Sequence, residues 1–330
     1  MQLVTNRWAP TSLIAFFIGA LFLACNQPFD PRGSLDRKMV VFSVLSTDRP
    51  MQFVRVQQSY MSPGYDPSSF ISDNSLTDAK VFIRASNGVY LFTDTSLARS
   101  DTNRYKFPLR AFVLNPFKPR WGDSYEVVVQ SASYGLASSS VIVPGQAQIS
   151  PSADATKIMS HPENYEQNSQ MTFFVQLSGV SEGYIGKLLL YYDVLKVSEW
   201  VEERIEVPLS SADSSNFTLD YPIYPRLAVI PPAARVALYY KNGYYRAAVN
   251  VVNSQYQSNR ILFKWATFVV LQADKNLFQY YSSTHASMDP YSTRLDEPIV
   301  ATLSGGLGLV GAYSLDSTVS ILPETFWGNR

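Results

Sequence analysis

The sequence predicts an all-β protein made of two β-sandwich domains of the immunoglobulin-like kind. Aromatic residues make up 14% of the 330 residues, and charged residues only 16%. Short runs of Val, Ile, Phe, Tyr and Thr alternate with clusters of Gly, Pro, Asn, Asp and Ser, which is the pattern of strands joined by turns. Two Asn-Gly dipeptides stand between such runs, and this dipeptide is the strongest local signal of a β-hairpin.

Both Asn-Gly dipeptides are predicted to lie at tight turns between antiparallel strands. A two-residue turn of this kind needs positive φ at both central positions, which Asn and Gly adopt at little cost. The first hairpin joins residues 79–86 to 89–93 through Asn87-Gly88, and the second joins 236–241 to 244–249 through Asn242-Gly243.

Eight further segments have the composition of strands: 39–45, 52–58, 124–130, 137–143, 171–177, 187–192, 200–207 and 260–270. One helix is predicted at 273–283. Its apolar residues Leu277, Phe278 and Tyr281 are three or four positions apart and share one face.

Turn sequences near residue 148 separate two sets of strands. Val143-Pro144-Gly145 closes the first set, and Ser150-Pro151-Ser152 opens the second. We expect an N-terminal sandwich over 35–148, about the size of an immunoglobulin-like domain. A larger β-rich domain that includes the helix should follow over 149–330.

The N-terminus has the form of a secretory signal peptide. Arg7 gives a positive start, and residues 13–24 (LIAFFIGALFLA) form an uncharged apolar run. That run is shorter than the roughly 20 residues that span a bilayer, and it fits the apolar core of a signal peptide. We therefore expect residues 1–24 to be removed.

Cys25, the one cysteine of the chain, follows the small residue Ala24 at the end of this run. The segment resembles a bacterial lipobox, although Phe22 stands where Leu is usual. The resemblance implies acylation of Cys25, with residues 25–34 as a polar tether. An ordinary signal peptide followed by a coincidental cysteine, or an uncleaved anchor, is the alternative.

Charge and cysteine content exclude several classes of function. Without Arg7, the 27 basic residues become 26, against 27 acidic ones. No run of Lys or Arg suggests binding to nucleic acid or to anionic lipid. Once Cys25 is acylated no thiol remains, so disulfides, thiolate metal sites and cysteine nucleophiles are not expected.

A literal G-x-G-x-x-G occurs at residues 306–311 (GLGLVG). In dinucleotide-binding folds these glycines turn the chain from a strand into a helix, so that backbone amides approach a pyrophosphate. Here the chain ends about 20 residues later, and residues 312–320 have the composition of strand and turn. We expect a glycine-rich bend or bulge at which backbones pack closely.

Histidines and carboxylates offer few candidates for catalysis. Pro162 follows His161 and breaks the helix that H-x-x-x-H zinc motifs need, so a solvated loop is expected there rather than a site shared with Glu163 and Glu166. His285 is expected near the end of the predicted helix. The chain has two histidines and no G-x-S-x-G elbow, which argues against a hydrolase triad.

Three glutamates lie close together in a predicted strand. Alternation places Glu202 and Glu206 on one face with Arg204 between them, which is typical of an ion-paired solvent face. Glu203 lies on the other face. The sequence predicts no catalytic, cofactor-binding or metal-ligating residue, and acylation at Cys25 as the one modification.

Tyrosine doublets recur along the chain. Within a strand, one member of each doublet should face the core and the other the solvent. The outward rings could line a surface that binds sugar or protein, and cross-strand pairing explains them as well. The doublets are Tyr191-Tyr192, Tyr239-Tyr240, Tyr244-Tyr245 and Tyr280-Tyr281.

These segments together resemble a family of Bacteroidota lipoproteins that carry a domain of unknown function and are often encoded near TonB-dependent outer-membrane receptors. The resemblance rests on residues 39–45 (MVVFSVL), 77–83 (TDAKVFI), 122–129 (GDSYEVVV), 141–144 (VIVP), 280–281 (YY) and 303–314 (LSGGLGLVGAYS). It covers most of the mature chain and is diffuse between about 150 and 260. None of these motifs is catalytic, so the resemblance transfers no functional residue.

Three functions follow as hypotheses. The resemblance implies a non-enzymatic outer-membrane lipoprotein that assists a TonB-dependent transporter or another envelope complex. A carbohydrate- or peptide-binding β-sandwich acting alone at the surface is the alternative, and a hydrolase is the third. Outward Tyr and Trp in a concave face would favour the second hypothesis, and a broad flat apolar patch the first. The residues do not define the ligand or the side of the membrane that the body faces.

Overall fold

A nine-stranded sheet runs through both halves of the protein in the computed structural model. The structure describes residues 35–61, 72–99, 107–208, 227–256, 260–285 and 302–329. Cys25, the predicted signal peptide and the whole of the predicted tether lie outside the described residues. Lys38–Arg330 forms one structural unit, and Met1–Arg37 another. Eight strands of the sheet follow the order β12-β11-β15-β16-β1-β2-β6-β5, and the short strand β13 pairs with β11.

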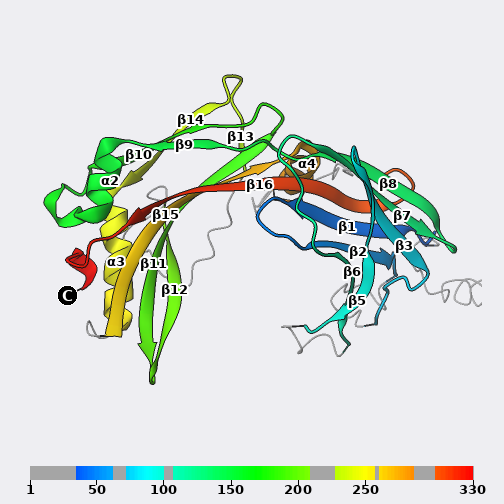
Figure 1. The fold of residues 1–330 in the computed structure, drawn as a ribbon, viewed down its shortest axis with the longest axis horizontal. Coiled ribbons are helices and arrows are strands. Elements are labelled where there is room, and N and C mark those ends of the chain that lie inside the picture. The colour runs from blue at the N-terminus through cyan, green and yellow to red at the C-terminus, as the bar shows by residue number, and fades with distance from the viewer. Residues whose placement is uncertain are drawn as a thin grey trace, which may run out of the picture. The chain divides into compact units, whose positions relative to one another are not determined.

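The strands of this sheet differ widely in length. They are β1 (Met39–Ser46), β2 (Gln52–Gln58), β5 (Thr93–Leu97), β6 (Leu109–Leu114), β11 (Gly183–Lys196), β12 (Glu199–Val207), β13 (Ala228–Val229), β15 (Ile261–Ala273) and β16 (Leu307–Ile321). β16 joins the two halves, because it pairs in parallel with β1 through its first residues and antiparallel with β15 through its last ones (Figure 1).

Two smaller sheets pack on the nine-stranded one. The four-stranded sheet has the order β4-β3-β7-β8, and the three-stranded sheet has the order β14-β10-β9. Their strands are β3 (Ala79–Ala85), β4 (Gly88–Leu91), β7 (Ser124–Ser131), β8 (Gly135–Ile142), β9 (Gln148–Pro151), β10 (Gln170–Gln176) and β14 (Arg235–Lys241). The prediction of an all-β, sandwich-like protein is therefore confirmed.

Three helices and two short 3-10 turns complete the described structure. They are α2 (Ala153–Ser160), η2 (Pro162–Asn164), α3 (Asn242–Gln255), α4 (Lys275–His285) and η4 (Trp327–Asn329). The Ser152 side chain caps α2 by accepting the backbone N–H of Ala155. Within the described residues, no helix is long and apolar enough to cross a membrane.

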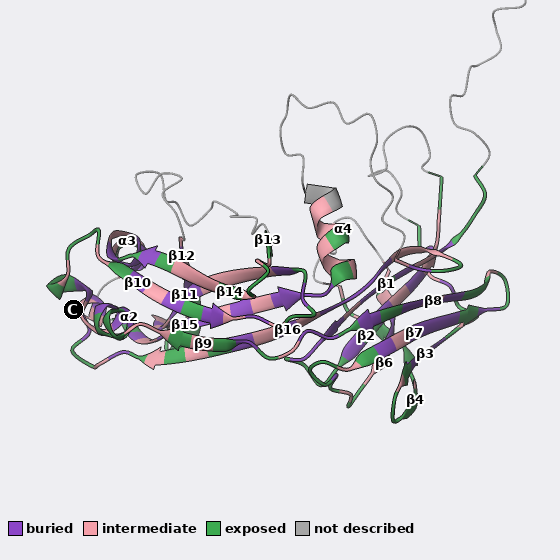
Figure 2. Cartoon of the chain, turned by 90° about the horizontal axis from the view of Figure 1, so that it is seen from above, coloured by how far each residue is buried: buried purple, intermediate pink, exposed green. Residues whose placement is uncertain are grey.

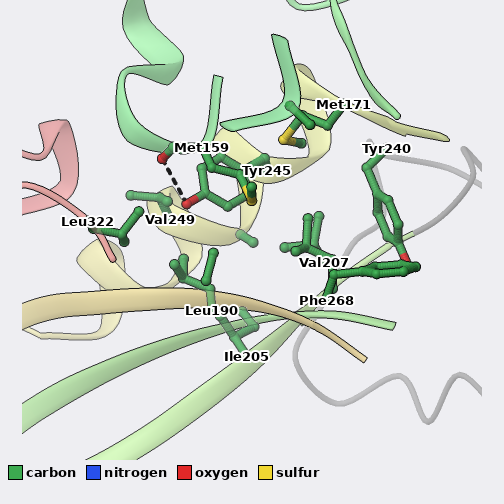
Figure 3. Close-up of a cluster of buried hydrophobic side chains, with 14 of the residues drawn as sticks. Met159, Met171, Leu190, Ile205, Val207, Tyr240, Tyr245, Val249, Phe268 and Leu322 are labelled. Carbon is green, nitrogen blue, oxygen red and sulfur yellow. Dashed lines mark hydrogen bonds between the residues drawn. The ribbon is translucent and has the colours of Figure 1, made fainter. Parts of the chain in front are cut away.

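Each smaller sheet closes its own hydrophobic core against the same face of the long sheet. The first core contains Val41 and Val54 of the long sheet with Val81 and Val127 of the four-stranded sheet. The second core surrounds Phe268 and takes in residues of β10, β11, α2 and α3 (Figure 3). Buried and exposed residues alternate along most strands (Figure 2), as expected for sheets with one buried face.

A buried polar junction lies between the two cores. The Gln272 amide donates to the carbonyl oxygen of Gly145 over 2.8 Å and accepts the backbone N–H of Ser178 over 2.6 Å. The Asp316 carboxylate accepts the backbone N–H of Ala147 over 2.8 Å. These bonds hold the chain at 145–147, close to the predicted boundary at 148, against the long sheet. The division into 35–148 and 149–330 stays a prediction, and one sheet contains strands from both ranges.

The eight further predicted strands correspond to β1, β2, β7, β8, β10, β11, β12 and β15, and the predicted helix to α4. The first hairpin is confirmed with one change. β3 ends at Ala85 and β4 begins at Gly88, so Ser86 and Asn87 form the turn. Gly88 follows it with φ of +152°.

The second predicted hairpin is wrong, because Asn242-Gly243 begins helix α3. The Asn242 side chain is fully buried, and its amide donates to the carbonyl oxygens of Pro162, Tyr165 and Glu166. The following residues bury one face at helical spacing, through Tyr244, Tyr245, Ala248, Val249 and Val252. Tertiary hydrogen bonds and this spacing outweigh the local turn preference.

Candidate functional site

A β-bulge in β15 places two large side chains on the outer face of the long sheet. Tyr191 is opposite Trp265 and Tyr192 is opposite Phe263, so Lys264 has no partner on β11. Phe263 and Ala266 both point into the second core. The two residues between them, Lys264 and Trp265, therefore lie on the outer side, in keeping with the way bulges redirect side chains.

The Trp265 and Tyr191 rings stack, with centroids 5.6 Å apart and planes 29° from parallel. Lys264 Nζ lies 4.7 Å from the centroid of the Trp265 ring. Arg204 Nη1 donates to the Tyr191 hydroxyl over 3.3 Å. Cation–π attraction from Lys264 stabilises the Trp265 ring, and the hydrogen bond from Arg204 fixes the Tyr191 hydroxyl.

Carboxylates balance Lys264 at the edge of this surface. Lys264 Nζ lies 3.1 Å from Asp193 Oδ2 and 3.9 Å from Glu202 Oε2. On the other side, Ile321 is opposite Trp265 and Val319 is opposite Thr267. Their exposures are 81% and 57%, so a bare aliphatic strip borders the aromatic pair. We refer to the surface formed by Tyr191, Arg204, Lys264, Trp265, Val319 and Ile321 as the Trp265 face.

The predicted ion-paired face of β12 is confirmed. Lys187 Nζ lies 2.7 Å from Glu206 Oε2, and Lys264 lies near Glu202. Glu203 is on the opposite side of the strand, where it pairs with Lys196. Glycosidases need two carboxylates that face each other across a substrate. Glu203 points away from Glu202 and Glu206, and those two are four residues apart on one strand, about 13 Å, farther than the roughly 5–10 Å between glycosidase carboxylates.

Glu203 instead holds the end of helix α3. Its Oε2 accepts the Tyr256 hydroxyl over 3.2 Å and the Tyr192 hydroxyl over 3.4 Å. The hydrogen bond from Lys196 lowers the pKa of Glu203, and burial raises the pKa of Tyr192. A carboxylate kept ionised by a lysine and two phenols is suited to a structural role at this position.

The outcome for the tyrosine doublets depends on the secondary structure. Tyr192 and Tyr240 face the core and Tyr191 and Tyr239 face outwards, as predicted for strands. Tyr244 and Tyr245 lie in α3, and both are buried. The Tyr245 hydroxyl donates to the carbonyl oxygen of Met159 over 3.2 Å (Figure 3). Tyr280 and Tyr281 are half-buried on α4.

The G-x-G-x-x-G segment leads into strand β16, whereas a dinucleotide motif needs a helix at this point. Gly308 has φ of +111°, and a Cβ atom there would lie 2.1 Å from the carbonyl oxygen of Val41 on β1. At Gly311 a Cβ atom would lie 2.8 Å from Leu277 Cβ of α4. These glycines allow close contact between β16 and its neighbours, which agrees with the predicted packing.

Asp274, just before α4, connects this helix to β16. Its Oδ1 accepts the backbone N–H groups of Leu277 and Ala312, each over 2.9 Å. Burial raises the pKa of Asp274 to about 6. The Asn276 amide donates to the carbonyl oxygen of Val310 over 3.0 Å. A buried carboxylate thus fixes α4 on the outer face of the sheet.

His161 ends α2, with Nδ1 3.5 Å from Glu163 Oε1, and Pro162 begins the 3-10 turn. The predicted break in the helix is therefore present. His285 is the last residue of α4, as expected, and its side chain lies outside the described atoms. Across the described residues, no group of three or more His, Cys, Asp or Glu side chains could hold a metal ion.

The outward positions of Lys264 and Trp265 were not predicted from the sequence. A signal was present, because Phe263 and Phe268 are five residues apart. A regular strand cannot bury both, since an odd spacing puts side chains on opposite faces. An extra residue between them was therefore needed, and Lys264 is that residue.

Comparison with known proteins gives a family and no function. No curated protein matches the sequence. A trypsin-activated alpha-2-macroglobulin from Escherichia coli is 7% identical over 75% of this chain and 15% of its own, with a TM-score of 0.20. The chitinase ChiA74 from Bacillus thuringiensis is 12% identical over 64% of this chain and 28% of its own, with a TM-score of 0.16. Neither likeness carries an argument about fold or function. A family model described as a domain of unknown function (DUF4249) matches residues 26–318, and the chain belongs to this family.

Proposed function

We propose that this chain is a non-enzymatic lipoprotein, held at the outer membrane through acylated Cys25, whose Trp265 face binds a protein partner. The proposed partner is a TonB-dependent transporter. The anchor is inferred from the apolar run at 13–24 and the cysteine that follows it. The partner is inferred from the resemblance to lipoproteins often encoded near such receptors.

The Trp265 face is the observation that carries the binding proposal. Tryptophan, tyrosine and arginine are the residues most enriched at the energetic centres of protein interfaces. Here Tyr191 contacts both Trp265 and Arg204, and Trp265 is opposite exposed Ile321. An apolar centre with charged residues at its edge is the usual composition of such interfaces.

The same geometry argues against a sugar as the ligand of this face. A pyranose ring stacks on an aromatic ring that has a free surface. The Trp265 ring is already stacked on Tyr191 and has Lys264 Nζ 4.7 Å from its centroid. A flat partner surface that covers the pair and the strip beside it fits this arrangement better.

Co-purification from native membranes in mild detergent tests the partner. We expect the receptor, identified by mass spectrometry, to accompany the wild-type chain and to be lost with Trp265→Ala. Leu91→Ala is the matched control, because Leu91 is 66% exposed on the four-stranded sheet. Equal recovery of the receptor with both variants would refute the role of the Trp265 face.

Metabolic labelling with palmitate tests the anchor separately. Cys25 is the one thiol of the chain, so Cys25→Ala should abolish incorporation of the label. Continued labelling of Cys25→Ala would contradict the lipoprotein proposal.

One observation favours a second candidate, a carbohydrate- or peptide-binding surface. Phe174 and Tyr239, on the adjacent strands β10 and β14, are 53% and 50% exposed. Rings exposed to this extent have free surfaces for stacking. Saturable binding of a glycan or peptide that Phe174→Ala abolishes and Trp265→Ala preserves would favour this candidate.

A further inference from the structure

Strand β12 forms one edge of the nine-stranded sheet. Among the described strands it pairs only with β11, in antiparallel register from Leu188↔Val207 to Lys196↔Glu199. An edge strand has unpaired N–H and C=O groups that can pair with another strand. Nine residues is long for such an edge.

The hairpin turn determines which backbone groups of β12 are free. Lys196 and Glu199 flank a two-residue turn, so they form a hydrogen-bonded pair, and such pairs alternate along an antiparallel ladder. Odd-numbered residues of β12 therefore direct their backbone groups to β11. The groups that point away belong to Trp200, Glu202, Arg204 and Glu206.

Three of the four glutamates of β12 have a cationic neighbour. Glu206 pairs with Lys187, Glu203 with Lys196, and Glu202 lies 3.9 Å from Lys264. Among the described residues, Arg204 has no ion pair, and its hydrogen bond is to the Tyr191 hydroxyl. The edge thus has an exposed guanidinium that lacks a carboxylate.

From this edge we propose that two copies of the chain pair antiparallel through β12, about a two-fold axis at Glu203. In this register Glu202 is opposite the partner's Arg204, and Arg204 is opposite the partner's Glu202. Trp200 is opposite the partner's Glu206. All four outward-directed residues form backbone hydrogen bonds, and both guanidinium groups gain a carboxylate.

Other two-fold registers fit less well. An axis at Arg204 puts the two guanidinium groups opposite each other and Glu202 opposite the partner's Glu206. An axis at Glu202 puts Arg204 opposite the partner's Trp200, so the guanidinium gains no carboxylate. An axis at Ile205 leaves Trp200 and Glu202 without strand partners. Of these registers, the axis at Glu203 is the one that gives Arg204 a carboxylate and pairs all four outward-directed residues, so it is selected. It also places the two Glu203 side chains opposite each other, where each carboxylate is already paired with Lys196. The interface is self-complementary, as a two-fold dimer requires.

Charge exchange tests the pairing in the full chain carrying Cys25→Ala, which prevents acylation. Analytical ultracentrifugation at micromolar concentration should show a dimer. Arg204→Glu and Glu202→Arg should each raise the dissociation constant at least tenfold, and the double variant E202R/R204E should restore the dimer. Circular dichroism confirms that each variant is folded.

Cysteine cross-linking tests the register in the same Cys25→Ala background. Residue 203 is opposite its own copy in a pair without mutual hydrogen bonds, where Cα atoms are about 4.5 Å apart. Glu203→Cys should therefore form an intermolecular disulfide. Val201→Cys is the control, because its copy would be about 13 Å away, beyond the roughly 7 Å limit for a disulfide.

Three results would overturn the proposal. The first is a Cys25→Ala chain that stays monomeric at all concentrations. This holds also if that monomer binds an added strand peptide of another sequence. The second is a dimer that survives Arg204→Glu. The third is cross-linking of Val201→Cys as fast as that of Glu203→Cys. The proposal does not depend on the transporter, since every measurement uses the purified chain alone.

Discussion

The two hydrophobic cores are built from different side chains although they share one sheet. In the first core, three of the 19 buried residues are aromatic, and the rest are aliphatic. In the second core, eight of 27 are aromatic. The buried residues of the aliphatic core come from strands and the loops beside them, whereas the aromatic core also contains residues of α2 and α3. Helix residues such as Ile158 and Val249 therefore pack with the aromatic rings of the second core.

The buried rings of the second core also bring polar groups inside. The Tyr240 hydroxyl donates to the carbonyl oxygen of Gly186, and the Tyr245 hydroxyl to that of Met159. Burial raises the pKa of both phenols. The second core therefore contains specific hydrogen bonds in addition to its buried apolar surface.

Removal of an aromatic ring from the second core should cause the largest loss of stability. Phe268 stacks on Phe173 with centroids 4.1 Å apart and is 1% exposed. Phe268→Ala should lower the free energy of unfolding by about 3–5 kcal/mol. Phe174→Ala, on the exposed face of β10 in the three-stranded sheet, should change it by less than about 0.5 kcal/mol. Urea denaturation measures both, and similar losses would show that ring burial does not dominate this core.

Gly308→Val tests the close packing of the first core. The new side chain would overlap the carbonyl oxygen of Val41 at a position with φ of +111°. Overpacking costs about 1–3 kcal/mol and the backbone conformation about 1 more, so we expect a loss of about 2–4 kcal/mol. Gly88→Val has open space around it and should lose only about 1 kcal/mol. Thermal unfolding compares them, and equal losses would argue against the close contact of β1 and β16.

Asp274 reports on the contact of α4 with the long sheet. Its pKa is raised from 3.8 to about 6 in the folded protein, so the folded state binds this proton more tightly than the unfolded chain does. The resulting stability is fully present below about pH 4 and is lost as the pH rises through about 6. The stability of the wild type relative to Asp274→Asn should therefore fall by at most about 3 kcal/mol over this interval. A difference independent of pH, or one that rises with pH, would contradict the burial of this carboxylate.

The smallest expected difference in unfolding free energy is between variants of the two Asn-Gly dipeptides. Asn242→Ala removes the donor to three carbonyl oxygens and should cost about 1–3 kcal/mol. Asn87→Ala, in an exposed turn, should cost less than about 0.5 kcal/mol. Chemical denaturation of the two variants under identical conditions checks this order, and the reverse order would mean that Asn242 has no special role in starting α3.

The first half of the fold could be predicted more fully than the second. In strands such as β1 and β2, buried residues alternate with more exposed ones, and the order of apolar residues in the sequence indicates a strand. In the second half, Tyr244-Tyr245 fits a strand or a helix equally well by composition. The spacing of Tyr244, Ala248 and Val252 indicates a helix, but the adjacent Asn-Gly favoured a turn. The carbonyl groups that bind Asn242 come from residues about 80 positions away, and no local pattern reveals them.

The candidate site was predicted only in part. Alternation placed Glu202, Arg204 and Glu206 together on one face, and the structure agrees. Trp265 was not predicted, because its direction depends on a bulge opposite Tyr191 and Tyr192. The exposure of Val319 and Ile321 depends on which part of the sheet α4 covers, and this is a tertiary property.

Hydroxyl-radical footprinting of intact membranes tests the proposed docking face most directly. The purified chain and the chain in its native membrane are labelled under the same dose, and the modification of Ile321 is compared with that of Leu91. These residues are 81% and 66% exposed, so both should react in the purified chain. We predict that Ile321 and Trp265 become protected in the membrane while Leu91 stays reactive. Equal modification of Ile321 in the two samples would contradict binding of a partner to the Trp265 face.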